Sequence, residues 1–109
     1  MKVREVLQAL PLRAVHLADP EREICGAYAG DLLSWVMGRA KPDQAWVTIM
    51  TNANVIAVAS LLDLSVVIIC DKCEPEPALI AAAEARGINL LAADMPLFEM
   101  CAALGRLLT

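Results

Sequence analysis

The stretch 44–70 restricts the fold of this chain more than any other part of the sequence. Two apolar runs in it, Trp46–Met50 and Ser65–Cys70, have strand length and are rich in β-branched residues, which favour strands. Between them, Val55–Leu62 has the length of a short helix and carries no charged residue. A strand, a helix and a strand within about 25 residues form a right-handed crossover, so the two strands are predicted to be parallel neighbours. Because both strands are apolar on both faces, helices are expected to cover both sides of the sheet.

The remaining segments predict the order helix, strand, strand, helix, strand, helix, strand, helix, strand, helix along the chain. The other strands are expected at Ala14–Leu17, Glu23–Ala29 and Ile88–Leu91. Asp31 and Asp94 are interpreted as helix N-caps. A further helix is expected from Pro77 to a left-handed end at Gly87. The predicted fold class is therefore α/β, as a single domain (residues 1–109) with a mainly parallel sheet of about five strands and helices on both faces.

Composition and charge narrow the range of partners. The net charge of −4 and the few aromatic residues argue against a nucleic-acid-binding face, which would need a basic patch. No segment supplies the roughly 20 apolar residues that span a bilayer, and the charged amino terminus does not resemble a signal peptide. No membrane partner and a cytoplasmic location are therefore expected. The apolar fraction of 59% exceeds the usual value of about 45–50%, and this surplus suggests a homo-oligomer.

The central helix Val55–Leu62 favours a homodimer in particular. It is apolar nearly all round, whereas a helix that covers one face of a sheet needs only one buried stripe. Its remaining apolar surface is expected to meet another helix or another subunit, and a different protein partner stays open as well.

Polar residues follow the strand Trp46–Met50, at the edge where ligands bind in parallel α/β sheets. In one interpretation the side chains of Thr51–Asn54 cap the free amides of the helix that follows. In the other, these side chains and amides bind an anionic small molecule, such as a nucleotide or a phosphorylated metabolite. The strand order is expected to bring the Gly26–Asp31 stretch to the same edge. The candidate ligand-binding residues are Arg22, Gly26, Asp31, Thr51, Asn52 and Asn54.

Four cysteines occur, and reduced thiols are expected in a chain without an export signal. Cys25 and Cys101 fall in apolar patterns and are interpreted as core residues. Cys70 and Cys73 have the Cys-x-x-Cys spacing, which leaves an inert loop, a redox pair or half of a metal site shared by two subunits as alternatives.

The sequence predicts no enzyme and no cofactor. Phosphoryl transfer needs a glycine-rich phosphate cradle, and none of the five glycines begins one or precedes a lysine. A single histidine leaves little scope for a nucleophile and base pair, and no such arrangement is recognisable.

At Glu21–Tyr28, with the sequence EREICGAY, the chain resembles the DRTGG domain family. Glu21-Arg22 stands at the acid-Arg position of the family pattern, and Cys25-Gly26-Ala27 stands where the family has Thr-Gly-Gly. The likeness continues through the Thr-x-x-Asn within Trp46–Ser60 and through Leu62–Ile69. The sequence departs from the pattern at Cys25, at Ala27 and at Cys70–Cys73, where relatives often have a glycine-containing turn.

The resemblance implies a small α/β domain similar to the amino-terminal domain of HPr kinase/phosphorylase. In larger proteins such domains accompany CBS domains or a pyrophosphatase and look regulatory or dimer-forming. Stand-alone members occur in anaerobic bacteria, often encoded near iron hydrogenase. The leading hypothesis is therefore a non-catalytic regulatory or interaction module that acts as a homodimer in hydrogenase or redox metabolism. A small-ligand sensor, and a redox or metal protein that uses Cys70 and Cys73, are the alternatives.

Overall fold

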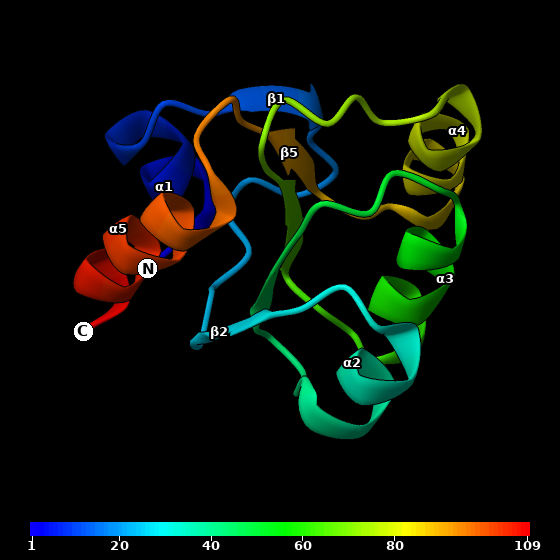
Figure 1. The fold of residues 1–109 in the computed structure, drawn as a ribbon, viewed down its shortest axis with the longest axis horizontal. Helices are drawn as coiled ribbons and strands as arrows, with labels where there is room; N and C mark the ends of the chain where they lie inside the picture. Colours follow the sequence, from blue (N-terminus) through cyan, green and yellow to red (C-terminus); the bar gives the residue numbers. More distant parts are fainter.

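A five-stranded sheet separates two layers of helices in the computed structural model, which describes residues 1–109 (Figure 1). The order across the sheet is β1-β5-β4-β3-β2. Strands β2 to β5 run parallel, and β1 is antiparallel to β5 at one edge. The strands are β1 (Arg13–His16), β2 (Ala27–Ala29), β3 (Ala45–Thr48), β4 (Val66–Ile69) and β5 (Leu90–Ala92). The predicted fold class, a mainly parallel sheet with helices on both faces, is confirmed.

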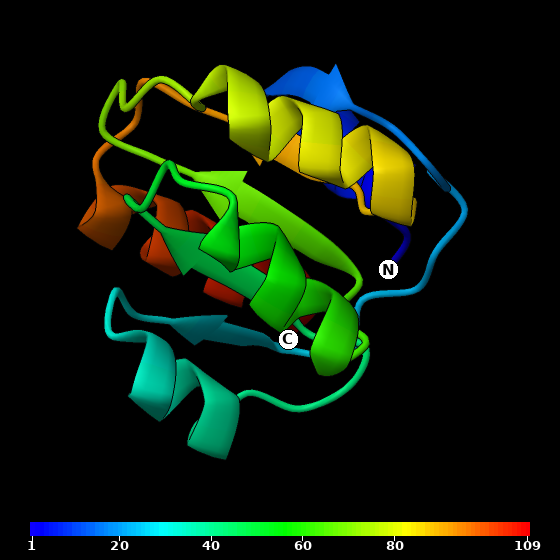
Figure 2. The same cartoon turned by 90° about the vertical axis from the view of Figure 1, so that its right-hand side faces the viewer.

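Helices α2, α3 and α4 cover one face of the sheet, and α1 and α5 cover the other (Figures 1 and 2). The helices are α1 (Val3–Ala9), α2 (Leu33–Arg39), α3 (Asn54–Leu61), α4 (Pro77–Arg86) and α5 (Leu97–Leu108). The order of the ten elements along the chain is the predicted one. None of these helices combines the length and the apolar character that crossing a membrane requires.

The two helix layers explain why the central strands are apolar on both faces. Val67 and Ile69 of β4 belong to the core beneath α2, α3 and α4, whereas Val66 and Ile68 belong to the core beneath α1 and α5. All four side chains are fully buried. Because successive residues of a strand point to opposite faces, such a strand has no position for a polar side chain.

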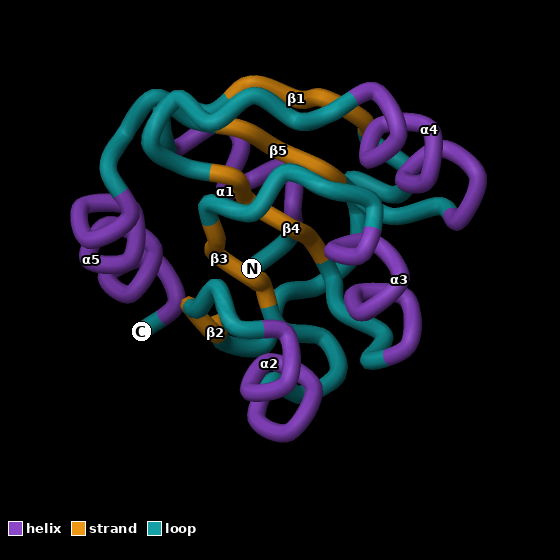
Figure 3. Tube along the Cα trace, turned by 45° about the vertical axis from the view of Figure 1, so that its right-hand side comes forward, coloured by secondary structure: helices purple, strands orange, loops and turns teal.

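Helix α3 is apolar nearly all round because it lies between α2 and α4 in its own layer (Figure 3). Val55, Ile56, Val58 and Ala59 are buried there. Leu61 is 70% exposed and is the large apolar side chain that α3 leaves uncovered. The sequence left open whether another helix or another subunit covers the apolar surface of this helix. Neighbouring helices of the same chain cover most of it.

Strand β2 is shorter than predicted. Only Ala27–Ala29 pair with β3, whereas Glu23 makes an isolated antiparallel bridge to Lys2. Gly26 has a φ of 97°, a backbone conformation that residues with a side chain rarely adopt, and it separates the two pieces.

Two of the predicted helix caps are wrong. Helix α2 begins after Leu32 and α5 begins after Pro96, and neither Asp31 nor Asp94 accepts a bond from a first-turn amide of these helices. The amide of Leu97 at the start of α5 instead donates to Asp71 Oδ2 at 2.9 Å. The predicted end of α4 is confirmed, because Gly87 follows Arg86 in the left-handed region with a φ of 65°.

Candidate functional site

The carboxyl ends of β2, β3 and β4 meet at one edge of the sheet, which we call the carboxyl edge. Asp31 follows β2 there, and its Oδ1 accepts hydrogen bonds from Thr48 Oγ1 at 2.7 Å and from the Ile49 amide at 2.9 Å. Thr48 is fully buried at the end of β3. Asp31 therefore joins the end of β2 to the end of β3, and this contact replaces its predicted capping role.

The Thr51–Asn54 corner lies at the same edge, and much of its hydrogen-bonding capacity is used within the chain. Asn52 Oδ1 accepts from the Asn54 amide at 3.0 Å, as in the capping interpretation. Thr51 Oγ1 donates to Glu76 Oε2 at 3.1 Å, and the carbonyl of Thr51 accepts from the Glu76 amide at 3.0 Å. A carboxylate thus already occupies the position beside Thr51 where a bound anion would lie.

Arg22 and Gly26 lie at the opposite, amino edge of the sheet. Arg22 Nη2 donates to Asp43 Oδ1 at 2.9 Å, to the carbonyl of Asp63 at 2.8 Å and to Asp63 Oδ1 at 3.1 Å. Asp43 and Asp63 precede β3 and β4, respectively. Burial acts to lower the pKa of Arg22, but the bonds to the two carboxylates outweigh burial and raise that pKa. Arg22 therefore holds the loops before β3 and β4 together. The six candidate residues lie at two opposite edges of the sheet and do not form one site.

The cysteines differ from each other in their surroundings. Cys25, expected in the core, is exposed, because it lies just before edge strand β2. Cys70 is buried, and burial raises the pKa of its thiol to about 12 from an ordinary 9.0, so the thiolate does not form at neutral pH. Cys73 is half-buried. No group of three or more cysteine, histidine or carboxylate side chains is placed to hold a metal ion.

The turn between Cys70 and Cys73 has an unusual backbone. Its central residues, Asp71 and Lys72, have φ angles of 61° and 59°, and the amide of Cys73 donates to the carbonyl of Cys70 at 3.1 Å. Positive φ at both central positions is the geometry of a type I′ turn, which favours glycine and asparagine. Asp71 and Lys72 therefore occupy backbone positions at which glycine would be adopted without strain.

Negative charge dominates the carboxyl edge. The acidic residues on or after the strands that end there are Asp31, Asp71, Glu74, Glu76, Asp94 and Glu99. Arg13 faces this edge from β1, and its Nη2 is paired with both carboxylate oxygens of Glu74, at 2.9 and 3.1 Å. Lys72, in the turn after β4, is the unpaired cation at this edge, so an anion that approaches would meet more carboxylates than cations.

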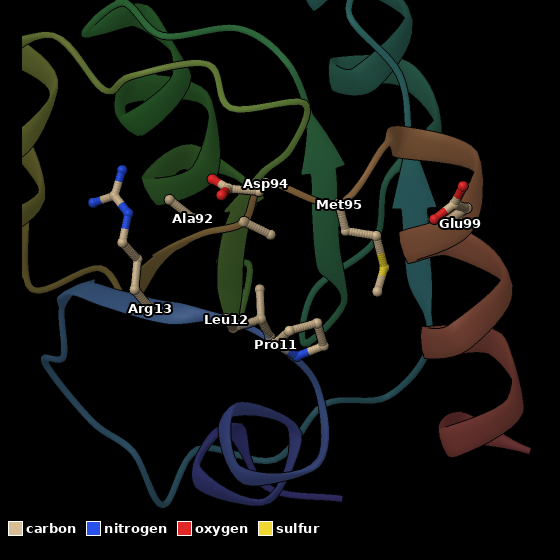
Figure 4. Close-up of a pocket in the computed structure, with 8 residues that line it drawn as sticks. Pro11, Leu12, Arg13, Ala92, Asp94, Met95 and Glu99 are labelled. Atoms are coloured by element: carbon tan, nitrogen blue, oxygen red, sulfur yellow. The ribbon is translucent and has the colours of Figure 1, made fainter.

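A hollow of about 510 Å³ opens at this edge between β1, β5 and the start of α5 (Figure 4). Arg13 and Glu99 lie at its opposite ends, with Met95 and Leu12 between them. Its charged groups therefore do not converge on one point, as polar groups do in most small-molecule sites.

A different surface, which the sequence did not single out, surrounds β2 at the edge of the sheet. Leu32 and Trp35 are 58% and 55% exposed, and together with Tyr28 they line a hollow of about 310 Å³ next to this strand. The guanidinium of Arg39 lies over the ring of Trp35, 3.8 Å from the ring centroid, in a cation–π contact. The three-residue spacing of Leu32 and Trp35 was a signal for one exposed stripe, but only the strand order shows that this stripe adjoins an open edge.

The fold is that of a DRTGG-like domain, which confirms the resemblance at the level of structure. A solved structure similar to this chain comprises the CBS and DRTGG domains of the regulatory region of a Clostridium perfringens pyrophosphatase, in complex with its activator diadenosine tetraphosphate. The TM-score is 0.73 and the sequence identity is 13% over 98% of this chain. This chain spans 46% of the length of that structure, which is less than half. No protein-family model matches the sequence, and no curated protein does.

Proposed function

We propose that this protein is a non-catalytic regulatory and interaction module that acts as a homodimer. The observation that carries the proposal is the exposure of Leu32 and Trp35 together beside edge strand β2. Single exposed apolar side chains are normal on a protein surface, whereas contiguous ones beside an unpaired strand are typical of interaction sites. The solved structure of similar fold belongs to a regulatory region, which supports a regulatory role.

Light scattering coupled to size-exclusion chromatography tests the homodimer. We expect the mass of two chains at about 500 µM and a shift towards one chain on dilution to about 1 µM, a range that covers weak and moderate dimers. The variant in which Leu32→Ser and Trp35→Ser are combined should be a folded monomer. Leu61→Ser is the matched control, because Leu61 is also exposed but lies on α3. A monomeric wild type across the whole range contradicts the proposal.

A small-ligand sensor is the second candidate, supported by the nucleotide activator bound to the protein of similar fold. In this candidate the Thr51–Asn54 corner and Asp31 contribute the ligand contacts at the carboxyl edge. Thermal unfolding with ATP, diadenosine tetraphosphate and inorganic phosphate tests it. Stabilisation that disappears in Asn54→Ala supports a site at this corner, because the exposed Asn54 side chain makes no hydrogen bond in the fold. Equal melting temperatures with and without each compound count against it.

The resemblance to stand-alone relatives supports hydrogenase or redox metabolism in an anaerobic bacterium as the process that such a module serves. A direct redox or metal role of Cys70 and Cys73 has weaker support, because the buried Cys70 thiol stays protonated at neutral pH. Elemental analysis of protein purified without chelators tests the metal role, and zinc or iron at half an equivalent per chain would favour it.

A further inference from the structure

One side of β2 has no partner in the sheet. The carbonyl of Gly26 accepts from the Ala45 amide at 3.0 Å, and the amide of Gly30 donates to the carbonyl of Val47 at 3.1 Å. Because hydrogen-bonding direction alternates along a strand, the backbone groups of Ala27 and Ala29 point away from β3. Both residues are exposed, and β2 is the last strand in the sheet order. Two amides and two carbonyls are therefore free to pair with another strand.

We propose that β2 pairs with β2 of a second copy of this chain, antiparallel and about a two-fold axis at Tyr28, which gives one continuous sheet across the dimer. This inference rests on the proposed homodimer and specifies its interface. With the axis at Tyr28, Ala27 lies opposite Ala29 of the second copy, and each such pair exchanges two hydrogen bonds. The four free groups of each chain are then all satisfied. This self-complementarity is what an isologous dimer requires, and it favours a second copy over an unrelated peptide.

The face of β2 that carries α5 leaves room for this pairing. A hollow of about 340 Å³ lies between the side chains of Ala27 and Ala29 and the α5 residues Cys101, Leu104 and Gly105. Small side chains on β2 leave this hollow unfilled, and it adjoins the edge strand to which the second strand would be added. Residues opposite each other in an antiparallel pair share a face, so the hollows of the two copies would join into one apolar space.

The other face of β2 supplies the exposed apolar stripe. Helix α2 lies beside the β2 edge of the sheet in Figure 2, and its Trp35 forms part of the hollow next to Tyr28. An added strand would lie under this overhang and would cover Leu32 and Trp35. The exposure of these two side chains in the single chain is thereby explained.

Charge also fits an antiparallel arrangement. Asp31 follows the carboxyl end of β2, whereas the turn that contains Lys41 lies beside its amino end, where Gln44 neighbours Gly26. Lys41 forms no ion pair within the chain. A two-fold axis at Tyr28 brings the carboxyl end of one β2 beside the amino end of the other, so Asp31 of each copy lies at the end of the strand where the other copy carries the unpaired Lys41. A parallel pairing would place like ends together.

The test uses Ala29→Pro, with Ala29→Ser as its matched control. Proline removes the outward amide of Ala29 and is tolerated on an edge strand, whereas serine keeps the amide. We expect Ala29→Pro to raise the dimer dissociation constant about 100-fold or more, because each dimer loses two hydrogen bonds and gains two clashes. Ala29→Ser should remain dimeric. If the wild type is a dimer and Ala29→Pro is an equally stable dimer, this interface is overturned but the homodimer is not. A monomeric wild type overturns both proposals.

Amide hydrogen exchange of the wild type provides a second readout that does not depend on a variant. In the dimer the amides of Ala27 and Ala29 should exchange at least about 10-fold more slowly than after dilution to the monomer, because pairing protects them. The Tyr28 amide, which faces β3, is the internal control. Its exchange rate should not change on dilution, because this amide takes no part in the proposed pairing. Rapid exchange of both alanine amides in a demonstrated dimer overturns the proposed pairing.

Discussion

Replacing Asp31 tests whether this residue of the carboxyl edge is a structural element of the fold. Asp31 Oδ1 accepts hydrogen bonds from Thr48 Oγ1 at 2.7 Å and from the Ile49 amide at 2.9 Å. In Asp31→Ala the hydroxyl of Thr48, a fully buried residue, loses its acceptor within the chain. The Ile49 amide can be rehydrated, because Ile49 is 41% exposed.

The expected cost follows from these two bonds. Hydrogen bonds to a charged acceptor contribute about 1.5–3 kcal/mol each, and most of the loss here comes from the buried Thr48 hydroxyl. We expect Asp31→Ala to lower the free energy of unfolding by about 2–3 kcal/mol, a large part of the roughly 5–15 kcal/mol typical of a domain. Asp31→Asn keeps an acceptor oxygen without the charge and should cost about 1 kcal/mol.

Urea unfolding followed by far-ultraviolet circular dichroism measures both variants. The midpoint of Asp31→Ala should fall by about 1–2 M, since the urea slope for a small domain is about 1–3 kcal/mol per molar. Asp94→Ala is the matched control, because Asp94 is exposed and accepts no hydrogen bond, so it should stay within about 0.5 kcal/mol of the wild type. An Asp31→Ala protein as stable as this control refutes the structural role.

Three further predictions concern the turn, the buried amide and the buried thiol. In urea unfolding, Lys72→Gly should raise the free energy of unfolding by about 1 kcal/mol, because glycine adopts the positive φ of this position without strain. Lys72→Ala should leave that free energy unchanged, because alanine keeps the side-chain carbon that disfavours a positive φ. Asn89→Ala should lower it by about 3 kcal/mol, because the buried amide of Asn89 makes four hydrogen bonds, to Ala18, Asp19 and Ser65; a loss below about 1 kcal/mol would contradict this. Since burial raises the pKa of Cys70 to about 12 from 9.0, its contribution to stability is complete below pH 9.0 and decreases as the pH rises to about 12, and this decrease should be absent in Cys70→Ala.

The fold could be predicted because its strongest signals are local. The apolar segments around Val66–Ile69 require cover on both faces, and proline at the start of α4 with Gly87 at its end fixes that helix from the sequence alone. The order of elements followed from these periodicities. The ends of the elements were less accurate where a distant contact decides them, as for β2, whose length depends on how much of it β3 can pair with.

The predicted site residues separated because their roles depend on partners far away in the sequence. Asp31 has the residue type and the position of a cap, but its acceptor oxygen meets Thr48, 17 positions later. Arg22 was grouped with the ligand residues, yet the loops before β3 and β4 bring two carboxylates to it at the amino edge. Cys25 lies in an apolar pattern and is nevertheless exposed, since the pattern does not tell which strand ends the sheet.

In a parallel α/β sheet, anions bind at the amino-terminal ends of the helices that follow the strands. In this chain, side-chain oxygens of the chain itself lie at these helix ends. Asn52 accepts from the first-turn amide of α3, and Asp71 accepts from the first amide of α5. Beside the start of α4, Glu76 accepts from Thr51. A phosphate would have to displace these contacts and overcome the surrounding carboxylates. At the β2 edge no such competition exists for the backbone groups of Ala27 and Ala29, which make no hydrogen bond within the chain, and the side chains of Leu32 and Trp35 are more than half exposed. Pairing with another strand there would use backbone groups that the fold leaves free, and this difference is why we propose association.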